Sequence, residues 1–206
     1  MQTTPRGGFT LKTLKLFLAL TLTTVCVGSA FADTIDFRGS DVTLGHSQVY
    51  NPGPTSVTAY AFGGSGLLYA KNDGGSEHGI GIARNNDNEI TNTTFIQLDL
   101  ANITGLYSLL IGSTQNVEGF NVCTSNELGT LGSSCRDFAI PQSDPFATPA
   151  FVKGARYVSI QTDRPGSTVL LDGLTTTNPV PEPSAFVLLG SGLLAGAGMI
   201  RRKLAL

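Results

Sequence analysis

Apolar and polar residues alternate along much of the middle of the chain. Ile96 and Leu98 alternate with Gln97 and Asp99, and a similar alternation recurs over residues 157–162. A period of two is the period of a β-strand, whose successive side chains point to opposite faces of a sheet. The pattern therefore predicts half-buried strands, with Gln97 and Asp99 on the face away from the core.

Further short segments extend this prediction over the whole central region. The additional predicted strands are 34–37, 56–62, 67–71, 79–83, 107–111, 119–123, 136–140 and 168–174. Clusters of Gly, Pro, Asn and Asp, such as Asn72-Asp73-Gly74-Gly75, separate the segments, and no long helical period interrupts them. About ten short strands joined by loops predict an all-β fold, an antiparallel β-sandwich of jelly-roll-like type.

The N-terminal region has a different pattern. Three basic residues precede an apolar run of roughly 12 residues, which is too short to span a bilayer comfortably. Ala30 and Ala32 then stand three places and one place before Asp33. Small residues at these two positions are typical of a signal-peptidase site, so we predict a signal peptide over residues 1–32 that is cut before Asp33.

The C-terminal region ends in a third pattern. A Pro-Glu-Pro tripeptide precedes a 16-residue apolar run that contains four glycines, and a basic cluster follows the run. Glycines weaken a water-soluble helix but are common in membrane helices, so the run predicts a single transmembrane helix rather than a core helix. The basic cluster resists translocation and would act as the stop-transfer charge, which leaves the body outside the membrane. The residues of the tripeptide and of the basic cluster are Pro181, Glu182, Pro183, Arg201, Arg202 and Lys203.

This order of tripeptide, apolar helix and basic end resembles the PEP-CTERM sorting domain of Gram-negative bacteria, over residues 180–206. The resemblance implies export, a tether at the inner membrane, and recognition by an exosortase-like enzyme that processes the tail near the tripeptide. Members of this family are associated with exopolysaccharide and biofilm-forming envelopes, so the expected destination is the cell envelope or the extracellular space. Residues 79–90 and 169–174 similarly resemble strands of jelly-roll ectodomains that carry such tails.

The region between the two ends, residues 33–179, has a suitable length for one ectodomain with its own core. Residues 33–180 contain 14 acidic and 7 basic residues, a net charge of −7. An acidic domain without a basic patch argues against binding to nucleic acid.

Cysteine usage agrees with export. Cys26 lies in the predicted signal peptide, which leaves Cys123 and Cys135 in the ectodomain. An isolated pair in an oxidising compartment predicts a disulfide. The polar, glycine-containing segment between the two cysteines predicts a loop that would be flexible without that bond.

The chain offers one weak candidate for a cofactor, a structural Ca²⁺ ion. Asp87, Asn88 and Glu89 carry the oxygen ligands that calcium prefers, but they lack the spacing of an EF-hand loop, and an ordinary turn is the favoured interpretation. His46 and His78 have no metal-ligand spacing, and the glycines around Glu77-His78 predict a surface loop.

No catalytic residue is predicted, because the chain has no Gly-x-Ser-x-Gly elbow or other catalytic motif. The favoured function is a structural or adhesive biofilm component without enzymatic activity. A glycan-binding module that recognises exopolysaccharide is the alternative, and a secreted hydrolase is the third hypothesis. Glycan binding would need an aromatic platform and polar loop residues. The chain has no tryptophan, so the candidates are Tyr50, Tyr60, Tyr69, Tyr107, Asp73, Asn86, Asp87 and Asn88.

Overall fold

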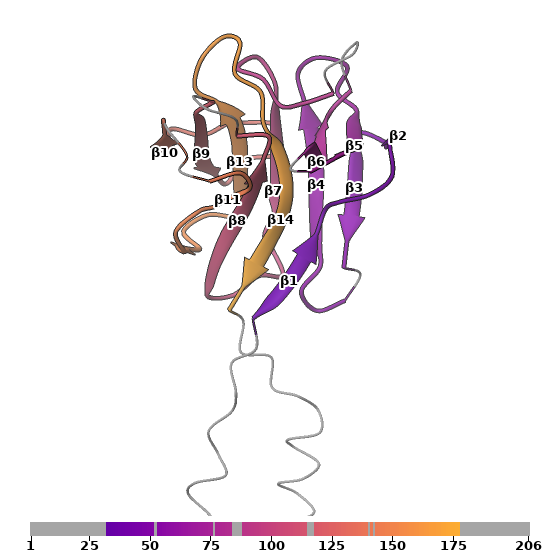
Figure 1. Ribbon diagram of the computed structural model, residues 1–206. Coiled ribbons are helices and arrows are strands. Elements are labelled where there is room, and N and C mark those ends of the chain that lie inside the picture. The colour runs from indigo at the N-terminus through magenta and orange to yellow at the C-terminus, as the bar shows by residue number, and fades with distance from the viewer. Residues whose placement is uncertain are drawn as a thin grey trace, which may run out of the picture. The chain divides into compact units, whose positions relative to one another are not determined.

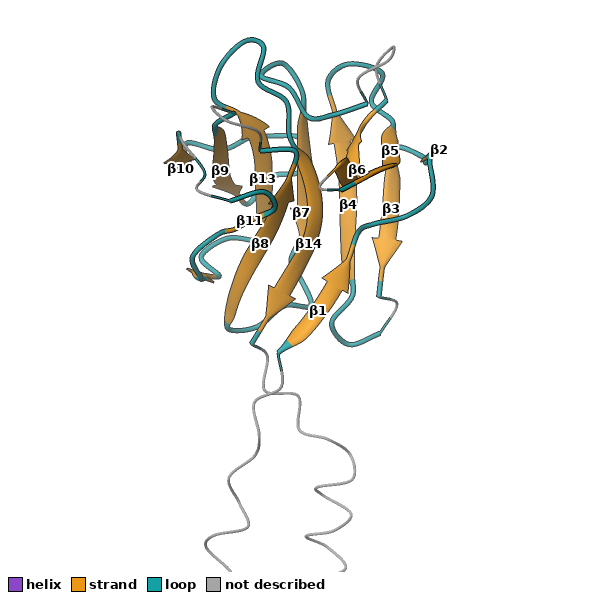
Figure 2. Cartoon of the chain, in the orientation of Figure 1, coloured by secondary structure: helices purple, strands orange, loops and turns teal. Residues whose placement is uncertain are grey.

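The computed structural model describes residues 32–177, apart from residues 52, 76, 84–87, 115–117, 140 and 142. Residues 1–31 of the predicted signal peptide, the Pro181-Glu182-Pro183 tripeptide, the tail helix and its basic end lie outside these residues. Every regular element in the described part is a β-strand, as the all-orange elements of Figure 2 show. None of the described segments is a helix long and apolar enough to cross a membrane.

Two antiparallel sheets form the described structure (Figure 1). In sheet A the strand order is β11 (Phe146–Ala147), β8 (Leu106–Gly112), β14 (Leu170–Thr176), β6 (Glu77–Ile82), β5 (Leu68–Gly74) and β2 (Val42–Thr43), with β1 (Asp33–Asp36) beside β14 and β12 (Phe151–Val152) beside β8. In sheet B the order is β10 (Ser134–Phe138), β9 (Phe120–Ser125), β13 (Tyr157–Thr162), β7 (Phe95–Asp99), β4 (Val57–Phe62) and β3 (Ser47–Tyr50). The prediction of an all-β fold with two antiparallel sheets is confirmed.

Each of the ten predicted strands overlaps a strand of the structure. The sequence pattern missed β2, β3, β11 and β12. Three of these have only two residues, and β3 is exposed over most of its length. Strands this short or this exposed have no buried face, so they leave no alternation of apolar and polar residues to detect.

The core lies between the two sheets and consists mainly of aliphatic side chains. Ile96 and Leu98 from β7 and Ile80 and Ile82 from β6 are all 0% exposed. Burial of each such side chain contributes about 1.5–3 kcal/mol to folding. The alternation in β7 thus identifies the core face of sheet B correctly.

The opposite face of β7 is not as the pattern predicts. Gln97 is 0% exposed, because the loop between the two cysteines folds over it. Its amide donates to the carbonyl oxygen of Thr130 at 2.9 Å and accepts from the Gly129 N–H at 2.8 Å. The prediction of an outward-facing Gln97 is wrong, because a long loop supplies a second covering layer that strand periodicity cannot reveal.

The predicted disulfide between Cys123 and Cys135 is present. The two residues are direct partners in the register of β9 and β10. The bond therefore joins the two strands at one point and closes the loop that covers Gln97. In the chain-entropy model a loop of this size contributes about 3 kcal/mol.

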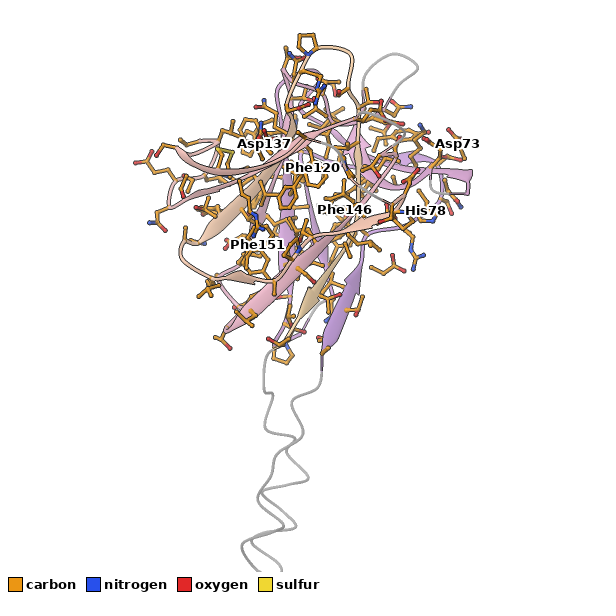
Figure 3. The ribbon with its side chains drawn as sticks, turned by 60° about the vertical axis from the view of Figure 1, so that its left-hand side comes forward. Asp73, His78, Phe120, Asp137, Phe146 and Phe151 are labelled. Carbon is orange, nitrogen blue, oxygen red and sulfur yellow. A yellow bond between two sulfur atoms is a disulfide. The ribbon has the colours of Figure 1, made fainter. Side chains whose placement is uncertain are left out.

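A cluster of aromatic rings closes one edge of the sandwich (Figure 3). Phe138 from β10 stacks on Phe120 at 5.0 Å between ring centroids, and Phe151 from β12 stacks on Tyr107 at 5.4 Å. The Arg136 guanidinium lies 5.2 Å from the centroid of Phe138, in cation–π geometry. Strand β10 at the edge of sheet B and strand β12 at the edge of sheet A thus complete the core on this side of the sandwich.

Both described ends of the chain lie at the same end of the sandwich. Strand β1 runs antiparallel to β14, with Asp33 opposite Thr176 (Figure 1). The predicted mature N-terminus and the start of the tail therefore leave the sandwich from neighbouring positions. Loops that precede β14 and follow β8 form the other end, since Leu170 at the start of β14 pairs with Gly112.

Candidate functional site

A polar pocket of about 490 Å³ lies at the end of the sandwich away from Asp33 and Thr176. It forms where the loop from Arg164 to Thr168 faces the end of β8 and the start of β6. Three carboxylates, three hydroxyl side chains and a Pro-Gly pair line it, together with an arginine. The lining residues are Glu77, Glu89, Ser113, Glu118, Arg164, Pro165, Gly166, Ser167 and Thr168.

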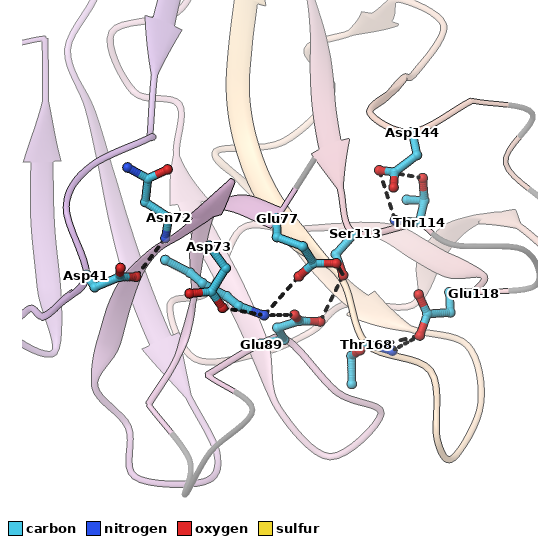
Figure 4. A network of polar contacts seen from close by, with 11 residues as sticks. Asp41, Asn72, Asp73, Glu77, Glu89, Ser113, Thr114, Glu118, Asp144 and Thr168 are labelled. Atoms are coloured by element: carbon cyan, nitrogen blue, oxygen red, sulfur yellow. Dashed lines mark hydrogen bonds and ion pairs between the residues drawn. The ribbon is translucent and has the colours of Figure 1, made fainter. Parts of the chain in front are cut away.

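A lysine between two glutamates organises the floor of the pocket (Figure 4). Lys71 Nζ lies 2.9 Å from Glu77 Oε2 and forms a second ion pair with Glu89 Oε1. The side chain of Lys71 is 13% exposed and that of Glu89 is 4% exposed. Ser113 completes the cluster, because its hydroxyl lies 3.0 Å from Glu77 Oε1 and 3.2 Å from Glu89 Oε2.

The local backbone explains why these side chains meet. Strands β5 and β6 form a hairpin whose register places Lys71 opposite Gly79, two residues beyond Glu77. Glu89 precedes Ile90, which is held by an isolated bridge to Val169. The hairpin and this bridge thus bring acidic residues of two separate segments to one lysine.

Burial and ion pairing shift the pKa values of the two glutamates in opposite directions. Burial raises the pKa of Glu89, and the Lys71 ammonium only partly compensates. Burial also acts to raise the pKa of Glu77, but hydrogen bonds from Lys71, Glu89 and Ser113 outweigh it, so this pKa lies below its usual value. Burial disfavours the ammonium form of Lys71, yet its hydrogen bonds to both carboxylates raise the pKa of Lys71 overall.

The far wall of the pocket is held by a separate set of hydrogen bonds. Thr168 donates from its backbone N–H and from its hydroxyl to Glu118 Oε1, both at 3.4 Å. Arg164 is paired with Asp163 at 2.6 Å. Ordered carboxylates and hydroxyls are acceptors and donors for the hydroxyl groups of a polar ligand.

The structure brings together only part of what the sequence suggested. Asn86 and Asp87 lie outside the described residues. Asn88 has a left-handed backbone with φ of 55°, and Glu89 turns to Lys71. No set of three metal-ligating side chains occurs among the described residues. Calcium binding at this loop stays a prediction.

The tyrosines proposed as a platform for sugars lie elsewhere. Tyr107 is 2% exposed in the core, and Tyr50, Tyr60 and Tyr69 are half-buried. Asp73 is exposed and lies 3.7 Å from Lys71 Nζ, at the edge of the pocket cluster. Two of the glycan candidates in the described part thus lie next to the cluster, Asp73 through Lys71 and Asn88 as the residue before Glu89.

Sequence reasoning missed the central members of the site. Lys71 and Glu77 lie in the polar stretch 71–78, whereas Ser113 lies 42 positions after Lys71 in a different segment. Only the hairpin register and the turn after β8 bring them together. Lys71 ends a predicted strand on the face opposite Leu68 and Ala70, where a charged residue is ordinary, so the sequence carries no signal of this cluster.

His78 also differs from its prediction. It belongs to β6 rather than to a surface loop, and its side chain is 20% exposed. The glycines on either side suggested a turn, but Gly79 is a strand residue with φ of 137°.

One of the comparisons with known proteins gives a match. Residues 179–203 match the family model of the PEP-CTERM protein-sorting motif. No curated protein and no solved structure matches the chain significantly. The chain thus carries a PEP-CTERM sorting motif, as the sequence resemblance predicted, and the motif implies export, a membrane-anchored intermediate and processing by an exosortase-type enzyme.

Proposed function

We propose that this chain is a structural or adhesive component of the cell envelope or extracellular matrix, without enzymatic activity. One observation carries the proposal: a sorting motif that begins at residue 179 follows directly on a sandwich whose last strand ends at Thr176. The sandwich is closed by a disulfide, which suits an oxidising location. The last strand of the sandwich ends at the opposite end of the sandwich from the polar pocket.

Substitution of the tripeptide tests the sorting step. In cells that produce the protein, replacing Pro181, Glu182 and Pro183 by alanine should remove the extended backbone that a processing enzyme needs. We expect the variant to accumulate unprocessed in the inner-membrane fraction and to fail to restore biofilm to a deletion strain. Thr177→Ala, which lies outside the motif, is the control. Normal release and normal biofilm with the triple variant would contradict the proposal.

Glycan binding is the second candidate function, and the pocket is the observation that favours it. Its volume of about 490 Å³ exceeds that of one sugar ring, and its lining of carboxylates and hydroxyls matches the donors and acceptors of a sugar. The pocket has a surplus of negative charge. Lys71 balances only part of the charge of the three glutamates, and Arg164 is already paired with Asp163. The ligand class that fits is therefore a neutral or amino-bearing polysaccharide rather than a uronic acid polymer.

A pull-down with immobilised polysaccharides tests this second candidate. Neutral glucans and chitosan should retain the purified full-length protein, whereas alginate should not. Glu118→Gln should weaken retention several-fold, and the exposed Asp137→Asn variant should not change it. Equal retention of the two variants would remove the pocket from consideration. Release of reducing sugar during the incubation would contradict the absence of enzymatic activity.

A further inference from the structure

A buried carboxylate lies in sheet A, outside the pocket described above. The side chain of Asp172 in β14 is 0% exposed. Neither of its oxygens accepts a well-aligned hydrogen bond from the described residues. Its polar contact is His78 of β6, whose Nδ1 lies 3.0 Å from Asp172 Oδ2. An ionised carboxylate in this position is costly unless a proton or a charged partner neutralises it.

Two local features of the backbone build this contact. The register between β14 and β8 shifts between Leu171 and Gly173, so Asp172 is the extra residue of a β-bulge. Opposite it, Gly79 leaves room for the carboxylate, because a Cβ atom at this position would lie 2.6 Å from Asp172 Oδ1. Bulges re-aim single side chains, and here the bulge directs Asp172 toward His78.

The contact joins two strands that share little backbone pairing. Strands β6 and β14 have a single pair in register, Leu171 with Ile80. The bridge between Ile90 and Val169 lies beyond it, outside both strands. A side-chain contact between β6 and β14 therefore carries a larger share of their association than it would in a fully paired ladder.

The charged groups around the pair are few. Arg38, which follows β1, attracts the ionised Asp172 but is itself paired with Asp36 at 2.8 Å. Asp36 of β1 interacts electrostatically with His78. Asp144, in the segment before β11, opposes ionisation of Asp172. The nearby charges therefore leave the burial of Asp172 largely uncompensated.

We propose that His78 and Asp172 form a proton-dependent lock between β6 and β14, closed while the pair holds a proton and weakened when the proton is lost. The partners lie on separate strands, so the lock changes the cohesion of sheet A rather than one loop. At mildly acidic pH the association of β6 with β14 is therefore stable, and at alkaline pH the two strands separate more readily.

The direction of the pH dependence follows from burial. Burial raises the pKa of Asp172 to about 7, above its ordinary value of 3.8. The folded protein thus holds this proton more tightly than the unfolded chain does. The stabilisation is fully present when the pH is below the ordinary pKa of 3.8, and it is lost as the pH rises through the folded-state pKa of about 7. Glu89, whose pKa is also raised by burial, acts in the same direction.

Thermal unfolding at pH 5 and pH 8 tests the lock, with the full-length protein in detergent. The Tm of the wild type should be about 5 °C or more higher at pH 5. Asp172→Asn supplies an amide in place of the protonated carboxyl group, so it should lose most of this difference and melt above the wild type at pH 8. Asp137→Asn, on the exposed face of β10, should keep the wild-type dependence. The difference in Tm that remains in Asp172→Asn is the contribution of Glu89, which that variant leaves unchanged.

A spectroscopic titration of the wild type keeps the test independent of whether the variant folds. The ¹³C signal of the Asp172 carboxyl group should titrate with a midpoint near 7. A midpoint near 4 would overturn the proposal. The same conclusion would follow if Asp172→Asn and the wild type had the same difference in Tm between the two pH values.

Discussion

Lys71→Met should lower the Tm of the protein by roughly 10 °C, because it leaves two carboxylates together without their shared cation. Lys71 lies 2.9 Å from Glu77 and also pairs with Glu89, whose side chain is 4% exposed. Removing one partner of a buried ion pair typically costs about 3–5 kcal/mol, since the remaining charge stays desolvated. Methionine keeps most of the apolar stem of lysine, so the fall in Tm reflects the missing ammonium charge rather than a cavity. Thermal unfolding at pH 7 measures it.

Two further variants separate this explanation from general damage to β5. The double variant Lys71→Met with Glu89→Gln should recover much of the lost Tm, because it removes the most buried of the unpaired charges. Arg156→Met breaks the pair with Asp99, in which the Arg156 side chain is 55% exposed, and should have a far smaller effect. A Lys71→Met variant that melts no lower than Arg156→Met would show that the cluster does not stabilise the fold.

Gly81→Ala should have an equally large effect for a steric reason. A Cβ atom at Gly81 would lie 2.0 Å from the carbonyl oxygen of Asn88 and 2.8 Å from Glu89 Cα. These are backbone atoms, so no side-chain rotation can relieve the contact, and β6 must move away from the segment that carries Glu89. We expect a loss of about 4 kcal/mol or more, read from chemical denaturation.

The matched control is Gly154→Ala, because a Cβ atom there meets nothing within 4 Å. This variant should unfold at the same denaturant concentration as the wild type. Equal stability of both alanine variants would mean that the segment at Asn88 and Glu89 does not pack against β6 as described. The pocket floor, which depends on Glu89, would then need a different arrangement.

The fold was predictable where burial leaves a pattern. Strands such as β7 and β13 alternate because one face meets the core, and the two cysteines formed the pair that the sequence predicted. Gln97 shows the limit of this reasoning, since its burial under the disulfide loop depends on a contact with Gly129 and Thr130 more than thirty residues away.

The site was less predictable than the fold. Clusters of polar residues close together in sequence drew attention to Asp87, Asn88 and Glu89, but the partners of Glu89 are Lys71 and Ser113. The Asp172 contact was hidden for a similar reason, because a bulge in β14 changes the face on which Asp172 lies. Register shifts and isolated bridges determine both sites, and neither leaves a periodic signal.

Mass spectrometry of the protein recovered separately from the membrane and from the medium tests the central claim most directly. We expect an N-terminus at Asp33, and in the medium a C-terminus trimmed at or near Pro181-Glu182-Pro183. The untrimmed tail should appear only in the membrane fraction, as the anchored intermediate. Extracellular protein that still ends at Leu206 would contradict sorting through the C-terminal motif.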